Sequence, residues 1–144
     1  MINLLGGIDS TSSALDAERI RMDVIAGNIA NANVTRGLDG KPYQRQEVVF
    51  ESVLRAQQNS DSPEAGSEKV QIARVQKDAR PPRMVYNPGH PDANSKGMVA
   101  FPNINIHEEM VDMIASSRSY EANLAVVKNA RAMAMGALSI GKHA

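Results

Sequence analysis

A seven-residue apolar repeat runs through both ends of this chain and is missing from its middle. Such a repeat places an apolar stripe along an α-helix, and that stripe needs a second surface to cover it. In the N-terminal segment it predicts a helix from about Asp9 to Asn33, with Gly6 and Gly7 breaking the chain beforehand. The members of this repeat are Ile8, Leu15, Met22 and Ile29, with Ile25 and Ala32 at intermediate steps.

The C-terminal segment predicts one longer helix, from about Asn105 to Gly141. Asn105 followed by Glu108 resembles a capping box, with Asn in place of the usual Ser or Thr. Acidic residues in the first turn suit the positive end of the helix dipole. The repeat comprises Met113, Tyr120, Val127 and Ala134, with Leu124 and Leu138 on the same face. The apolar surface is widened beyond a two-helix seam by Val126, Met133 and Ile140.

Between the helices the apolar pattern changes to a period of two, which is typical of strands. Short strands are predicted at residues 46–50, 70–75, 83–86 and 98–101, and prolines between them require turns or edges. A polar stretch at 55–68 is predicted to be a flexible loop. We therefore predict an α+β fold in which the terminal helices form a coiled-coil-like domain. Its parts are an N-terminal helix segment at 1–40, a small β-rich domain at 41–103 and a long C-terminal helix at 104–144.

The lengths of the two helices differ, and this bears on what covers them. At 1.5 Å per residue they would span roughly 36 Å and roughly 55 Å, so an antiparallel pair leaves part of the longer helix bare. The central segment could cover some of that surface. Other copies of the chain could cover it instead, and we favour this alternative because uncovered apolar faces usually mark interfaces.

Composition excludes several classes of function. The formal net charge is zero, so the chain lacks the basic excess that nucleic-acid binding requires. There is no cysteine, and the three histidines at 90, 107 and 143 lack the spacing of a metal site, so we predict no metal and no cofactor. Nucleophile and phosphate-loop motifs are absent, which indicates a protein that is not an enzyme. No apolar run is long enough to span a bilayer.

Three asparagines near the end of the first helix allow two interpretations. Asn28, Asn31 and Asn33 alternate with small residues, which gives a low helix propensity. They could mark a fraying helix end, with Asn33 as a left-handed cap. They could also form a close-packed contact, in which the amides bond across an interface. Physical reasoning leaves these two interpretations balanced.

Several motifs resemble one known family. The stretch from Leu15 to Asn33 resembles the N-terminal motif shared by bacterial flagellar rod and hook proteins. Four further stretches, at 39–46, 86–91, 98–105 and 109–123, are similar to a proximal-rod component, and the resemblance covers nearly the whole chain apart from 55–68. The rival interpretations are a soluble helical adaptor, another rod or hook paralogue, and a surface-membrane amphipathic protein.

This resemblance implies a structural subunit that assembles with other rod proteins and with copies of itself. It implies a position in the periplasmic rod of the basal body, where the terminal helices build a tube that transmits torque. It further implies passage through the flagellar type III export apparatus without a cleaved signal peptide, and no membrane insertion. On this basis the assembly interface is predicted to comprise Leu15, Met22, Ile25, Asn28, Ile29, Asn31, Asn33, Met113, Tyr120, Leu124, Val127 and Leu138.

Overall fold

The computed structural model describes residues 4–54 and 68–141, and nearly all of the predicted loop at 55–68 lies outside these ranges. The described chain has two terminal helices and two antiparallel, two-stranded sheets, which confirms the α+β class. The elements are α1 (Leu4–Ala30), β1 (Gln46–Leu54), β2 (Glu68–Lys77), β3 (Arg83–Tyr86), β4 (Met98–Phe101) and α2 (Ile106–Gly141).

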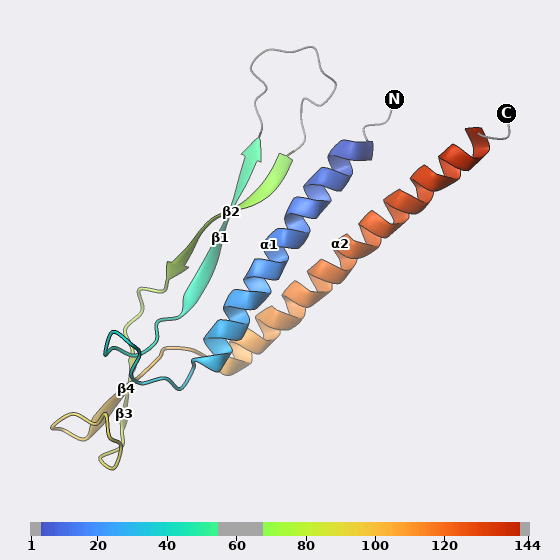
Figure 1. The fold of residues 1–144 in the computed structure, drawn as a ribbon. Helices are drawn as coiled ribbons and strands as arrows, with labels where there is room; N and C mark the ends of the chain where they lie inside the picture. Colours follow the sequence, from blue (N-terminus) through green and yellow to red (C-terminus); the bar gives the residue numbers. More distant parts are fainter. Residues whose placement is uncertain (1–3, 55–67, 142–144) are drawn as a thin grey trace.

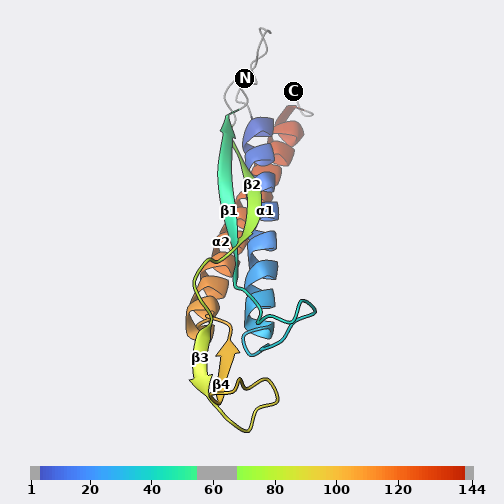
Figure 2. The same ribbon diagram turned by 90° about the vertical axis from the view of Figure 1, so that its left-hand side faces the viewer.

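The elements form an elongated body in which α1 is the central layer. The two helices lie side by side and run in opposite directions, so the described ends of the chain lie at the same end of the body (Figure 1). The hairpin of β1 and β2 runs along α1 on the side away from α2, as the rotated view also shows (Figure 2). The hairpin of β3 and β4 lies at the opposite end, beyond the point where α1 ends and α2 begins.

The helix ends partly match the sequence prediction. α1 begins at Leu4, so Gly6 and Gly7 lie inside the helix. The predicted chain break at these two glycines is wrong. It ends at Ala30, where the Asn31 side chain donates to the Gly27 carbonyl at 2.8 Å. At the start of α2, Asn105 Oδ1 accepts a hydrogen bond from the His107 amide at 3.1 Å. This is the predicted cap.

The capping box at the start of α2 has an unusual partner. Glu108 Oε1 accepts a bond of 3.0 Å from the Asn105 side-chain amide, whereas a standard box would use the backbone N–H of the capping residue. Both the oxygen and the nitrogen of the Asn105 side-chain amide are therefore hydrogen-bonded at the start of α2.

Both hairpins follow from local sequence. β1 and β2 pair from Gln46↔Lys77 to Leu54↔Glu68, with one bulge between Val49 and Phe50. β3 and β4 are shorter, and a turn at Gly97, with φ of 73°, precedes β4. A Cβ at Gly97 would lie 2.9 Å from the Tyr86 ring, so this turn needs glycine for two reasons.

Among the described residues the buried apolar core is small, and it lies along α1 and at β4. Its apolar members are Ala17, Ile25, Ala32 and Val99. The helices are in register where Ser116 of α2 donates to the Glu18 carbonyl at 3.4 Å and also to the Glu18 carboxylate. Because both helices rise 1.5 Å per residue, this register brings Leu4 level with roughly residue 130. The last turns of α2 therefore extend past α1, as Figure 1 shows.

Candidate functional site

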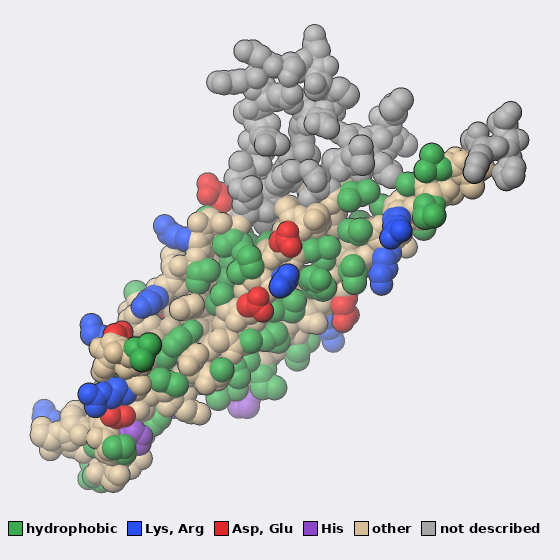
Figure 3. Space-filling view, viewed as in Figure 1, with side chains coloured by type: hydrophobic (Ala, Val, Ile, Leu, Met, Phe, Trp, Pro, Cys, Tyr) green, Lys and Arg blue, Asp and Glu red, His purple; other side chains and the backbone are tan. Residues whose placement is uncertain are grey.

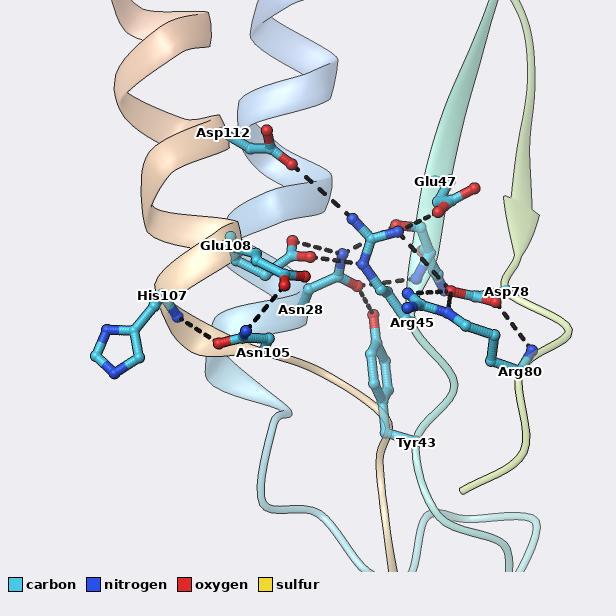
Figure 4. A network of polar contacts seen from close by, with 12 residues as sticks. Asn28, Tyr43, Arg45, Glu47, Asp78, Arg80, Asn105, His107, Glu108 and Asp112 are labelled. Carbon is cyan, nitrogen blue, oxygen red and sulfur yellow. Dashed lines mark hydrogen bonds and ion pairs between the residues drawn. The ribbon is translucent and has the colours of Figure 1, made fainter. Parts of the chain in front are cut away.

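The Asn28 side chain is buried where α1, α2 and β1 meet. Its Nδ2 donates to the Gln46 carbonyl at 2.9 Å and to Glu109 Oε2 at 3.0 Å. Its Oδ1 accepts from the Gln46 amide at 2.9 Å and from the Tyr43 hydroxyl at 3.2 Å. Only 1% of Asn28 is exposed, and these four bonds use the full capacity of an amide (Figure 4). Asn28 therefore fastens the first residue of β1 to α1.

A buried ion pair completes this site. Glu109, in the first turn of α2, is 1% exposed, and its Oε1 accepts a bond of 2.6 Å from Arg45 Nε. The Arg45 side chain is 17% exposed and lies immediately before β1. One carboxylate thus bonds α1 through Asn28 and the hairpin through Arg45. Removing either partner would leave a buried polar group unpaired, which is costly. The pair therefore favours one arrangement of α1, α2 and the long hairpin.

Arg45 is surrounded by further carboxylates. It bonds to Glu47 and lies 3.9 Å from Asp78 and 4.0 Å from Asp112 (Figure 4). Burial acts to lower the pKa of Arg45, but the hydrogen bond and charge of Glu109 outweigh it, and the pKa is raised. Burial, followed by the charge of Glu109, raises the pKa of Tyr43. Arg45 therefore stays charged and Tyr43 stays a neutral donor at physiological pH.

Asp78 connects the end of β2 to the same site. Its amide donates to the Arg45 carbonyl at 2.7 Å, and its carboxylate pairs with Arg80 at 2.6 Å. Hydrogen bonds from the Arg80 side chain and backbone lower the pKa of Asp78. We call Asn28, Tyr43, Arg45, Asp78 and Glu109 the polar junction. It is the point where α1, α2 and both strands of the long hairpin meet.

The polar junction should make stability depend on pH. Because the pKa of Asp78 is depressed, its pairing stabilises the fold above the ordinary carboxyl pKa of about 4 and is lost as pH falls through the lowered value. We expect Asp78→Asn to be less stable than the parent at pH 7, with the difference shrinking towards pH 3. Urea unfolding at pH 7, 5, 4 and 3 measures this. Arg80→Gln should behave in the same way, and a difference that stays constant with pH would contradict the assignment.

A second polar contact holds the short hairpin. The Thr35 hydroxyl donates to Asp92 at 2.8 Å, and Arg36 lies 3.7 Å from the same carboxylate. The Asp92 amide donates to His90 Nδ1 at 3.1 Å, and the His90 ring meets Phe101 edge to face. The segment after α1 is therefore attached to both hairpins by side-chain bonds.

The surface of α2 carries large apolar side chains that packing within one chain leaves exposed. Its half-buried residues recur at steps of three and four on the side of Ser116, which bonds α1. Large apolar side chains nevertheless also lie on its other sides, and Figure 3 shows apolar side chains along the visible part of this helix. The exposed apolar residues of α2 are Ile106, Met110, Val111, Ile114, Val126, Met133, Met135, Leu138 and Ile140.

The residues predicted to form the assembly interface fall into several environments. The half-buried ones are Leu15, Met22, Ile29, Asn31, Met113, Tyr120, Leu124 and Val127. Ile25 and Asn28 are buried within the chain, whereas Asn33 and Leu138 are exposed. Among them, Asn28 bonds Tyr43, Gln46 and Glu109, and Asn31 bonds the Gly27 carbonyl. Their role between subunits stays a prediction.

Sequence reasoning missed Arg45 and Glu109. Glu109 was attributed to the helix dipole, yet its carboxylate is buried and bonded to two other elements. A signal existed in the stretch from Tyr43 to Gln46, which carries a charge directly before a strand and belongs to a matched motif. It did not reveal which carboxylate Arg45 would meet.

Other kinds of site receive no support from the described residues. Within 4–54 and 68–141, no group of His, Asp and Glu residues is arranged to hold a metal ion. Neither of the two described helices combines the length and hydropathy needed to cross a membrane.

Comparison with known proteins gives a consistent result. Residues 8–37 match the family model "Flagella basal body rod protein", and residues 95–140 match "Flagellar basal body rod FlgEFG protein C-terminal". The flagellar basal-body rod protein FlgC of Borreliella burgdorferi is 40% identical over 149 residues, covering 96% of this chain and 98% of the relative. FlgC of Bacillus subtilis is also 40% identical, covering 94% and 96%. FlgC of Yersinia enterocolitica is 38% identical, covering 98% and 100%.

These relatives match this chain over nearly its whole length, and the two family models cover the terminal segments that carry the heptad repeats. The chain therefore belongs to the FlgC family of flagellar basal-body rod proteins.

Proposed function

We propose that this structural rod subunit joins its neighbours in the flagellar basal body through the exposed apolar residues of α2. The observation that carries the proposal is that α2 is apolar on more than one side, while α1 covers only one of them. Large exposed apolar surfaces on a soluble domain mark interaction sites. Their recurrence along the helix axis fits a partner that is itself an elongated helix.

The kind of assembly follows from the shape of the subunit. A rod needs contacts between different surfaces of successive subunits, because such heterologous contacts build open helical arrays. The exposed apolar residues of α2 differ from the polar junction and from the hairpin, so one copy can offer α2 to a different face of the next. The partners proposed here are other rod proteins and further copies of this chain.

The polar junction supports a role in torque transmission. A subunit that carries torque must keep its parts in fixed relation under load. Asn28, Glu109 and Arg45 link the helical pair to the long hairpin through buried bonds, and close packing resists shear. We propose that the two helices act as a coiled-coil-like axial domain and that the central β-rich part is held to it as one body.

The route to the basal body forms part of the same proposal. Rod proteins of this family are expected to leave the cell through the flagellar type III export apparatus, without a cleaved signal peptide. The exported chain would then fold and assemble in the periplasm as a building block with no enzymatic activity.

Thiol labelling can test the assembly surface, because the chain has no cysteine of its own. We expect Met133→Cys to react rapidly in the isolated protein, where Met133 is 63% exposed, and at least about tenfold more slowly in purified basal bodies. Ser116→Cys, at a buried position, is the control that should react slowly in both states. Equal rates for Met133→Cys in both states would overturn the proposal.

A further inference from the structure

A hollow of about 550 Å³ lies beyond the C-terminal end of α1, between the chain after α1 and the link from β2 to β3. Its apolar wall consists of Val34, Leu38, Pro42, Tyr43 and Pro82. This volume is in the range of protein pockets that bind a ligand, and such pockets are lined mostly by apolar side chains with a few polar ones.

Leu38 distinguishes this hollow from an ordinary surface depression. It is fully exposed at the tip of the turn from Gly37 to Lys41, so it contributes little to the stability of its own chain. The turn is nevertheless well defined: the Gly37 amide donates to the Lys41 carbonyl at 2.8 Å, and Gly40 has φ of 73°. A defined turn therefore presents an apolar side chain to the outside at the rim of an apolar hollow.

The charges around the hollow are partly neutralised within the chain. Asp78 pairs with Arg80 at 2.6 Å and lies 3.9 Å from Arg45, which itself bonds Glu109. Asp39, Lys41 and Lys77 also line the hollow, so its apolar wall, which suits an apolar occupant, is bordered by charged side chains.

The opposite end of the molecule carries a surface of matching chemistry. Residues 132–141 contain no charged side chain, and this stretch lies in the part of α2 that extends past α1. It is continuous with the assembly surface proposed above. Its exposed apolar side chains are Met133, Met135, Leu138 and Ile140.

We propose that the hollow receives the uncharged end of the C-terminal helix of an adjacent rod subunit, with Leu38 packing against it. The inference rests on the proposed function, because it names the partner of the last turns of α2. The match of residues 95–140 to the FlgEFG C-terminal family model indicates that other rod proteins carry a similar segment. The donor of the helix end is therefore a rod-family subunit. The hollow and the helix end lie at opposite ends of the helical pair, so the contact is heterologous and repeats along the axis.

The area of this contact limits its strength. Four apolar side chains bury roughly 100 Å² each, so both partners together lose roughly 800 Å² of accessible surface. That is below the size of a stable two-protein interface, which is about 1,200 Å² or more. The contact should therefore be absent from dilute isolated protein and form in the rod, where each subunit has several neighbours.

Site-specific photo-cross-linking in assembled basal bodies tests the contact. A benzophenone amino acid at position 38 should form adducts whose cross-linked peptide, identified by mass spectrometry, comes from the C-terminal helix of a rod subunit. The same probe at position 138 should reach residues 34–43 of a rod subunit. Adducts from position 38 only to other segments, or no adduct, would overturn the inference. If Met133→Cys is still protected in basal bodies, that failure leaves the proposed function standing.

A pair of substitutions supplies the functional readout. Leu38→Asp should leave the melting temperature of the monomer unchanged, because Leu38 is fully exposed. It should lower the fraction of cells with a complete rod at least about tenfold, a factor typical of losing one buried apolar contact. Ser95→Asp, an exposed position in the turn between β3 and β4, is the matched control and should assemble normally. Normal rods in the Leu38→Asp strain would contradict the inference.

Discussion

Replacing Val126 and Met133 together by aspartate should abolish motility while leaving the isolated protein folded. Both side chains are more than half exposed, at 54% and 63%, so the charges stay in water in the monomer. In the rod the same charges would be buried against an apolar neighbour, at a cost of several kcal/mol per unpaired charge. Swimming assays, electron microscopy of basal bodies and thermal unfolding of the purified variant together measure this result.

The matched control lies on the other side of the same helix. Leu124 and Val127 are half-buried on the side of α2 that faces α1. The variant with aspartate at both positions should also be non-motile, but its monomer should lose about 3 kcal/mol or more of unfolding free energy. Normal motility of the Val126 and Met133 double variant would exclude this part of α2 from the assembly surface.

Replacing Glu109 by alanine should give the largest loss of monomer stability of any single change proposed for this chain. The substitution leaves Asn28 Nδ2 with one bond fewer and Arg45 without its most buried partner. Breaking a buried pair costs about 3–5 kcal/mol, and we expect about 3 kcal/mol because Arg45 keeps Glu47 and Asp78. For a chain of this length, the melting temperature should fall by roughly 10 °C. Urea and thermal unfolding measure the change.

Two variants separate the loss of the ion pair from the loss of side-chain volume. Glu109→Gln keeps the shape and an acceptor for Asn28 but removes the charge opposite Arg45, so it should lie between the parent and Glu109→Ala. Glu108→Ala removes the exposed neighbour that bonds only the Asn105 side chain, and it should cost no more than about 1 kcal/mol. Equal stability of Glu108→Ala and Glu109→Ala would show that the junction does not hold the elements together.

The polar junction also gives the asparagine motif a physical role. The sequence left two interpretations of Asn28, Asn31 and Asn33, a fraying helix end or a close contact. In the structure the Asn31 side chain donates to the Gly27 carbonyl in the last turn of α1, whereas Asn33 as a left-handed cap stays a prediction. Asn28 makes the close contact of the second interpretation, but with the backbone of its own β1. Asn28 therefore makes a close contact within its own chain, and a contact of this motif with another subunit stays a prediction.

The sequence alone was sufficient for features that depend on local pattern. Heptad spacing predicted both terminal helices, alternation predicted strands at each place where β1 to β4 occur, and Asn105 predicted the cap of α2. These features follow from side-chain periodicity and from hydrogen bonds within a few residues, which do not depend on distant parts of the chain. The predicted start of the first helix, at about Asp9, was wrong, because α1 begins at Leu4. A glycine weakens a helix by only about 1 kcal/mol, and two successive glycines did not end it.

Only the tertiary structure decided which polar groups meet. Arg45 and Glu109 are 64 positions apart, and Asn28 and Glu109 are 81 apart, so no local pattern pairs them. The sequence also does not reveal which apolar side of α2 is buried. The structure shows that α1 covers one side and leaves apolar residues exposed on the others. Periodicity determines which residues share a face, whereas the packing of distant elements determines whether that face is buried or left for a neighbour.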